Sequence, residues 1–139
     1  MEFTALNEQE LVESIYKELE ASLKAGFRVG LIGDLGAGKT ALTRGILKKL
    51  GVNEPVTSPT FTLRKFYTTS SGLKVQHIDL YRQEKDVNSY EVEEWLRESE
   101  FLTFVEWIDN LSKSSGLFDV VIKLEFLGDT KRKVELIWN

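Results

Sequence analysis

One eight-residue segment, Gly33-Asp34-Leu35-Gly36-Ala37-Gly38-Lys39-Thr40, constrains the fold of this chain more than any other. It matches GxxxxGK[ST], the pattern of a loop that holds nucleotide phosphates (a P-loop), whose glycines let the backbone amides turn inward. Lys39 would place a cation on the β and γ phosphates, and the Thr40 hydroxyl would offer a ligand to Mg²⁺. Because such a loop joins a buried strand to a helix, the segment also predicts the local fold on both sides.

The flanking sequence supplies that strand and that helix. Residues 27–32 form a short apolar run typical of a buried strand, and apolar residues recur at helical spacing from Gly38 to Leu50. An amphipathic helix is predicted before them at 8–24, where leucine or isoleucine recurs every four positions. Contacts with the nucleotide are predicted at Asp34, Leu35, Gly36, Ala37, Gly38, Lys39, Thr40 and Ala41.

The rest of the pattern predicts one α/β domain over residues 1–139. Further elements are expected as strands at the end of 56–69 and at 74–80, 101–105, 120–126 and 133–138, with a helix at 88–98. The last two strands flank Gly128-Asp129-Thr130, which indicates a C-terminal β-hairpin. This order predicts a single P-loop NTPase-like domain whose mixed parallel and antiparallel sheet is flanked by helices.

Composition excludes several classes of protein. The chain has no cysteine, which rules out a disulfide framework, a thiolate nucleophile and a Cys-ligated zinc site. A net charge of -4 argues against a protein whose main task is to grip a nucleic-acid backbone. The N-terminus does not resemble a signal peptide, and no run approaches 18 apolar residues, so we expect a cytoplasmic protein without a membrane segment.

Two carboxylates follow predicted strands and are candidates to complete the site. P-loop enzymes place an acidic residue at a strand end, where it orients Mg²⁺ and the attacking water. Asp79 follows 75–78 and Glu106 follows the more apolar 101–105, so both are predicted as catalytic residues and metal ligands. The alternative for each is a carboxylate that caps a strand end. The single histidine, His77, would share a strand face with Asp79, and a packing or hydrogen-bonding role is favoured for it.

Two further features admit two interpretations each. The hydroxyl cluster at Thr57, Ser58, Thr60 and Thr62 suits a loop that senses the γ phosphate, but an ordinary Ser/Thr-rich turn explains the composition equally well. Trp107 can stack on a base or face a partner, although an aromatic residue beside a strand end is more often part of the core or an interface.

Four motifs in order resemble the TsaE (YjeE) family over nearly the whole chain. They are the P-loop, Ser58-Pro59-Thr60-Phe61-Thr62-Leu63, His77-Ile78-Asp79-Leu80-Tyr81-Arg82 and Val105-Glu106-Trp107. The resemblance implies a protein that binds ATP and Mg²⁺ and joins the TsaD and TsaB proteins, the machinery that places a threonylcarbamoyl group on adenosine 37 of ANN-decoding tRNAs. Its ATPase activity, weak alone, would support turnover of that complex, and its contact with tRNA would be indirect.

The resemblance also assigns roles to individual residues. Lys39 and Thr40 would hold phosphate and Mg²⁺, Glu106 would act on the metal and the catalytic water, and Asp79 would support the same centre. A switch segment is implied at 58–61, which includes Thr60 as a nucleotide contact. The nucleotide would be enclosed by residues 3–7 and by Lys131 or Arg132, and Trp107 is predicted to contact it. Ala41 departs from the family, which often has a second Thr or Ser there.

Three rival functions are compared with this prediction. A small-molecule kinase would share the P-loop, but such kinases usually close an arginine-bearing lid, and the arginines of this chain are not clustered. A GTPase would carry the Asn-Lys-x-Asp motif that reads guanine, which is absent. A nucleotide-dependent interaction module would bind ATP without useful hydrolysis.

Overall fold

The computed structural model describes residues 1–57, 63–81, 89–111 and 116–139. Its elements, in chain order, are β1 (Glu2–Ala5), α1 (Glu8–Leu19), η1 (Glu20–Ser22), β2 (Arg28–Gly33), α2 (Lys39–Lys49), β3 (Arg64–Thr68), β4 (Lys74–Asp79), α3 (Ser89–Leu96), β5 (Phe101–Glu106), η2 (Ile108–Asn110), β6 (Val120–Gly128) and β7 (Lys131–Trp138).

The seven strands of the described residues form one mixed sheet in the order β1-β7-β6-β2-β5-β4-β3. Its centre is parallel, because β2 pairs in parallel with both β5 and β6, and β5 pairs in parallel with β4. Antiparallel pairs complete the two sides, with β3 on β4, β7 on β6 and β1 on β7. The parallel centre places the carboxyl ends of β2, β4 and β5 at the same edge of the sheet.

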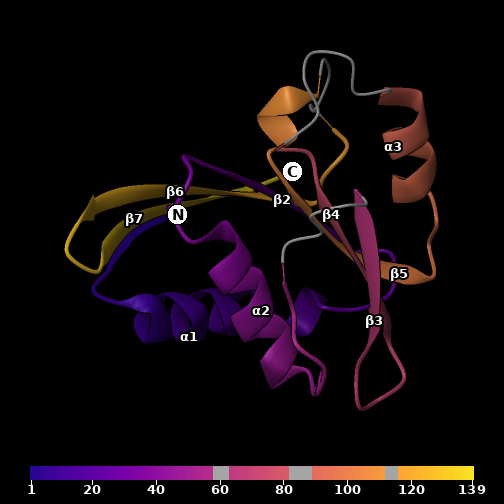
Figure 1. Ribbon diagram of the computed structural model, residues 1–139, viewed down its shortest axis with the longest axis horizontal. Helices are drawn as coiled ribbons and strands as arrows, with labels where there is room; N and C mark the ends of the chain where they lie inside the picture. Colours follow the sequence, from indigo (N-terminus) through magenta and orange to yellow (C-terminus); the bar gives the residue numbers. More distant parts are fainter. Residues whose placement is uncertain (58–62, 82–88, 112–115) are drawn as a thin grey trace.

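Helices cover both faces of the sheet (Figure 1). On one face, α1 and α2 bury residues such as Leu11 and Ile46 against Leu31 and Phe104 of the sheet, in one apolar cluster. On the other face, Val92 and Leu96 of α3 pack in a second cluster that includes Ile78. The α1–α2 pair and α3 hold the parallel strands between them at fixed positions, which is what a site at the strand ends requires.

The structure confirms the predicted fold class, including the mixed sheet and the C-terminal hairpin. It also confirms the start of the first helix, where Asn7 Oδ1 accepts a hydrogen bond from the Glu10 amide at 2.8 Å, but the α-helix ends at Leu19 and only the 3-10 turn η1 follows it, short of the predicted end at residue 24. Strand β1 was missed. Only Ala5 of its four residues is buried, so its sequence carries no strand pattern, and it is defined by antiparallel pairing with β7.

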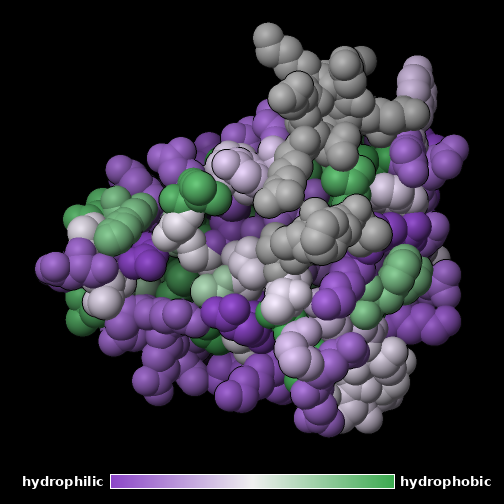
Figure 2. All heavy atoms as spheres, in the orientation of Figure 1, coloured by the Kyte–Doolittle hydropathy of each residue, from purple (hydrophilic) through white to green (hydrophobic). Residues whose placement is uncertain are grey.

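The surface in Figure 2 is hydrophilic over most of the face in view, with hydrophobic side chains at the free end of the β6–β7 hairpin on the left. Phe126 and Leu127 there are each nearly half exposed. Among the helices of the described ranges, none is long and apolar enough to cross a membrane.

Candidate functional site

The glycine loop runs from the end of β2 to the start of α2, as the motif predicts. Gly36 and Gly38 have φ angles of +82° and +107°, in a region that residues with side chains rarely adopt. Gly38 is also the N-cap of α2 and offers no side-chain cap, and the first turn of this 11-residue helix holds no acidic residue. The amides of that turn therefore remain available to an anion, to which the helix dipole adds its positive end.

Lys39 lies inside the loop with only 4% of its surface exposed. Its Nζ donates hydrogen bonds to the carbonyl oxygens of Gly33 and Asp34, the second at 3.0 Å. The same nitrogen lies 4.0 Å from the ring centroid of Trp107. Burial lowers the pKa of Lys39 below its ordinary value of 10.5, although neighbouring carboxylates, Glu106 first among them, favour the charged form.

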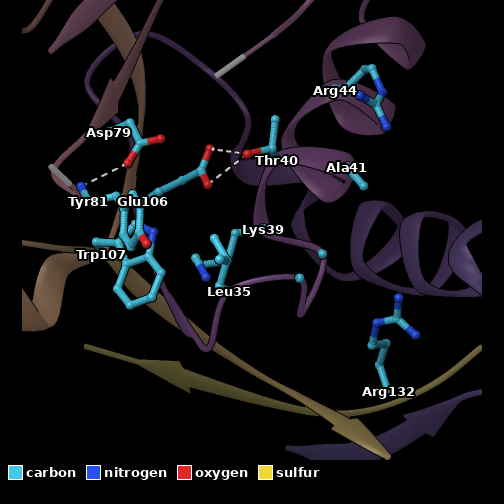
Figure 3. A pocket seen from close by; sticks show the side chains of 12 residues that line it. Leu35, Lys39, Thr40, Ala41, Arg44, Asp79, Tyr81, Glu106, Trp107 and Arg132 are labelled. Atoms are coloured by element: carbon cyan, nitrogen blue, oxygen red, sulfur yellow. Dashed lines mark hydrogen bonds between the residues drawn. The ribbon is translucent and has the colours of Figure 1, made fainter. Parts of the chain in front are cut away.

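The predicted carboxylates meet beside Thr40 (Figure 3). Asp79 and Glu106 are paired residues of the parallel strands β4 and β5, so both side chains leave the sheet at the same edge. Thr40 Oγ1 lies 2.9 Å from Glu106 Oε1 and 3.0 Å from Oε2, and its hydroxyl donates to that carboxylate. Asp79 Oδ1 accepts a hydrogen bond from the Tyr81 amide at 2.9 Å, which ties Tyr81 to the end of β4.

His77 makes a contact that the sequence did not specify. Its side chain is fully buried, and Nε2 lies 2.5 Å from Glu106 Oε2. The spacing of two residues places His77 and Asp79 on one face of β4. The Glu106 side chain lies on the same face of the sheet, because Glu106 pairs with Asp79. The structure confirms the hydrogen-bonding role favoured for His77 and identifies Glu106 as its partner.

Trp107 lines the pocket and also packs on the core beneath it. Its backbone has φ 62° and ψ 44°, a left-handed conformation that is unusual for a bulky residue and is typical of functional turns. The Trp107 amide donates to Leu31 O at 3.0 Å, and the ring centroid lies 4.9 Å from that of Tyr81 with the planes tilted by 35°. Its ring also packs against the second apolar cluster, so it has the core role that was favoured while facing Lys39 as well.

A pocket of about 440 Å³ unites these groups. It is lined by Leu35, Gly36, Gly38, Lys39, Thr40, Ala41, Arg44, Asp79, Tyr81, Glu106, Trp107 and Arg132. Figure 3 shows the two arginines on one side and the carboxylates on the other, with Lys39 between them. The pocket is thus cationic where it meets the helix and hairpin, and anionic at the strand ends.

Most of the predicted site residues line this pocket. Ala37 is buried beneath it and accepts a hydrogen bond from Arg132 Nε at 2.9 Å, which ties the last hairpin to the loop. Asp34 is not among the lining residues, and residues 3–7 supply none, although Ala5 pairs with Arg132 across the β1–β7 register. Thr60 and the switch segment at 58–61 lie outside the described residues.

Two lining residues were missed by the sequence reasoning. Arg44 lies one helical turn after Thr40, and that spacing was the only signal that pointed to it. Tyr81 stands in the third family motif, but nothing in its type or position alone indicated that its ring would meet Trp107.

The oxygen donors of the pocket suit Mg²⁺ better than a metal that needs many protein ligands. Across the ranges that the structure describes, no three His, Cys, Asp or Glu side chains are grouped to hold a metal ion. The Thr40 hydroxyl and the Glu106 carboxylate lie within 3.0 Å of each other, and Asp79 faces the same pocket. In proteins Mg²⁺ is commonly bound by one or two carboxylates together with phosphate oxygens and water, and this set of donors agrees with that preference.

The fold and the site together define a protein of the P-loop NTPase-like class. A family model described as "Threonylcarbamoyl adenosine biosynthesis protein TsaE" matches residues 6–134. The chain belongs to the TsaE family.

Individual relatives are similar to this chain over nearly its whole length. The chain is 35% identical over 133 residues to the tRNA threonylcarbamoyladenosine biosynthesis protein TsaE of Aquifex aeolicus, covering 94% of this chain and 92% of that protein. The protein of the same name from Rickettsia felis is 37% identical over 96% of this chain and 78% of its own. A crystal structure of Bacillus subtilis YdiB superposes with a TM-score of 0.71 at 28% identity, covering 96% of this chain and 82% of that one.

Proposed function

We propose that this protein binds ATP with Mg²⁺ and hydrolyses it as an accessory subunit of the tRNA threonylcarbamoyladenosine machinery, supporting turnover of a complex of TsaD and TsaB. The observation that carries the proposal is the contact between Thr40 Oγ1 and the Glu106 carboxylate at the head of α2, in a chain that belongs to the TsaE family. A cytoplasmic location and indirect contact with tRNA are parts of the same proposal.

Each residue has a task that follows from its surroundings. The amides at the start of α2 bind phosphate oxygens, and Lys39 exchanges its two carbonyl partners for phosphate, since an ammonium group prefers the stronger acceptor. Bound Mg²⁺ would neutralise charge on the β and γ phosphates, held by Thr40 and Glu106 with Asp79 beside them. Glu106, which is nearly inaccessible to solvent, orients the attacking water and accepts its hydrogen bond.

The remaining wall of the pocket orients the nucleotide. Arg132 reaches the loop through Ala37 O, so it holds the hairpin against the phosphate site and adds a positive charge there. The Tyr81 and Trp107 rings lie in contact, and the Trp107 ring covers one side of Lys39. Together these groups place the phosphates between cations and carboxylates, as phosphoryl transfer to water requires.

The test is steady-state phosphate release from ATP, measured for the protein alone and with TsaD and TsaB. The proposal predicts low activity alone and stimulation by the partners, with Lys39→Ala and Glu106→Gln each lowering the stimulated rate by about 100-fold or more. Lys48→Ala and Glu125→Gln are the matched controls, because both residues are exposed and lie outside the pocket. No stimulation, or equal rates in the site and control variants, would refute the proposal.

The same assay separates the rivals. A small-molecule kinase would transfer the γ-phosphoryl group to an acceptor, so with ADP measured alongside phosphate, the ADP formed would exceed the free phosphate. An interaction module would bind ATP but show no partner-dependent release, and Glu106→Gln would leave its function unchanged.

A further inference from the structure

The orientation of the Glu106 carboxylate depends on more than its contact with Thr40. Glu106 is the last residue of β5 and is only 2% exposed, so protein groups rather than water must hydrogen-bond its carboxylate. Both of its oxygens lie within 3.0 Å of Thr40 Oγ1, and Oε2 also contacts His77 Nε2 at 2.5 Å. One carboxylate thus has a partner on the P-loop helix and a second partner on the neighbouring strand.

Among the described residues, the sheet places the His77 ring in polar contact with Glu106 alone. In the parallel register of β4 and β5, His77 pairs with Phe104 and Asp79 pairs with Glu106, so all four side chains leave the same face. His77 is 0% exposed, and within the described part of the chain its Nδ1 has no hydrogen-bond partner. The Nε2 contact with Glu106 is therefore the single polar interaction that this ring makes there.

The chemistry of the contact fixes the direction of the hydrogen bond. An ionised carboxylate only accepts, and a neutral imidazole carries one N–H and one bare nitrogen. A contact of 2.5 Å between Nε2 and Oε2 of an ionised carboxylate therefore requires a proton on Nε2, and Nδ1 has no hydrogen-bond partner among the described residues. A hydrogen bond to a charged acceptor is about twice as strong as one between neutral groups, and burial keeps water from competing for it.

We propose that His77 is a positioning residue, whose Nε2–H holds Oε2 of Glu106 so that the carboxylate faces Thr40. This inference rests on the proposed function, since the arranged pair is the one assigned to Mg²⁺. The general rule is that partners which orient a metal-binding carboxylate matter nearly as much as the ligand, and their loss costs about 10- to 100-fold in metal affinity or activity.

Two substitutions separate positioning from packing. His77→Gln keeps an N–H donor at nearly the reach of Nε2, whereas His77→Met fills similar space without a donor. Thr103→Val is the matched control, because Thr103 is a buried β5 residue on the opposite face whose hydroxyl bonds Gln76 instead of the site. Thermal unfolding of all three variants reports the loss of stability that any buried substitution causes.

The readout is the Mg²⁺ concentration that half-saturates the protein bound to ADP, together with ADP affinity without Mg²⁺. We expect His77→Met to raise the half-saturating Mg²⁺ concentration by about 10- to 100-fold while ADP affinity without Mg²⁺ stays within about threefold of wild type. His77→Gln should recover most of the loss, and Thr103→Val should match wild type. Equal Mg²⁺ dependence in His77→Met and wild type, or equal losses in His77→Gln and His77→Met, would overturn the proposal.

A second measurement needs neither a variant nor a ligand. The chain has one histidine, so the ¹⁵N chemical shifts of the imidazole ring in the labelled full-length protein belong to His77 without ambiguity. The proposal expects a proton on Nε2, and a ring with a bare Nε2 and a protonated Nδ1 would overturn it. If the wild-type protein bound no ADP, the proposed function would fail, and the position of this proton would still decide whether His77 holds Glu106.

Discussion

Lys39 shows how a single residue is held in a conformation that suits a ligand more than the fold. Its ammonium group is buried between two loop carbonyls and the face of Trp107. Burial disfavours the charge, which is why its pKa is lowered, and the nearby carboxylates recover only part of that cost. A buried lysine with a lowered pKa indicates a functional site, here one that binds an anion such as phosphate.

Replacing Lys39 by Met should therefore raise the thermal stability of the nucleotide-free protein at neutral pH while abolishing ATP binding. Because the folded state loses this proton more readily than the unfolded chain, wild-type stability rises with pH between the lowered pKa and 10.5. The advantage of Lys39→Met should shrink over that range. Melting temperatures from pH 7 to 10 check this, with the exposed Lys48→Met as control; a lower melting temperature for Lys39→Met at pH 7 would contradict it.

At the scale of elements, the packing of α1 against α2 holds in place the helix that begins at the phosphate loop. Gly45 of α2 faces Val12 of α1 so closely that an added Cβ would lie 2.5 Å from Val12 Cγ2. The sequence predicted both helices from their apolar spacing, but it did not indicate that they pack against each other at this point. Periodicity reveals which face of a helix is buried but not which element packs against that face. Strand β1 was missed for the same reason, because its pairing with β7 joins residues far apart in the sequence.

Gly45→Ala is expected to destabilise the fold by about 1–2 kcal/mol. Overpacking typically costs about 1–3 kcal/mol, and the better helix propensity of Ala offsets up to about 1 kcal/mol. In a Val12→Ala background the two Cγ contacts are removed and only Cβ at 3.2 Å remains, so the same substitution should cost clearly less. Urea unfolding of the four proteins in this cycle measures the coupling; equal effects of Gly45→Ala in both backgrounds would show that the contact is not the cause.

At the scale of the whole molecule, the site exists because three parallel strands end at one edge. The motif at 33–40 is local, so the sequence identified it directly. Asp79 and Glu106 were also predictable, since each follows an apolar strand and parallel strands carry their ends to a common edge. Arg44, Tyr81 and the partner of His77 were not, because those contacts arise from register and helix placement, which no short pattern encodes.

The central claim is that this nucleotide site serves tRNA modification. Its most direct test is the threonylcarbamoyladenosine content of tRNA in cells depleted of the protein and complemented with wild type, Lys39→Ala or Lys48→Ala. We predict that depletion removes the modification and that wild type and Lys48→Ala restore it, whereas Lys39→Ala does not. Unchanged threonylcarbamoyladenosine after depletion, or full restoration by Lys39→Ala, would contradict the claim.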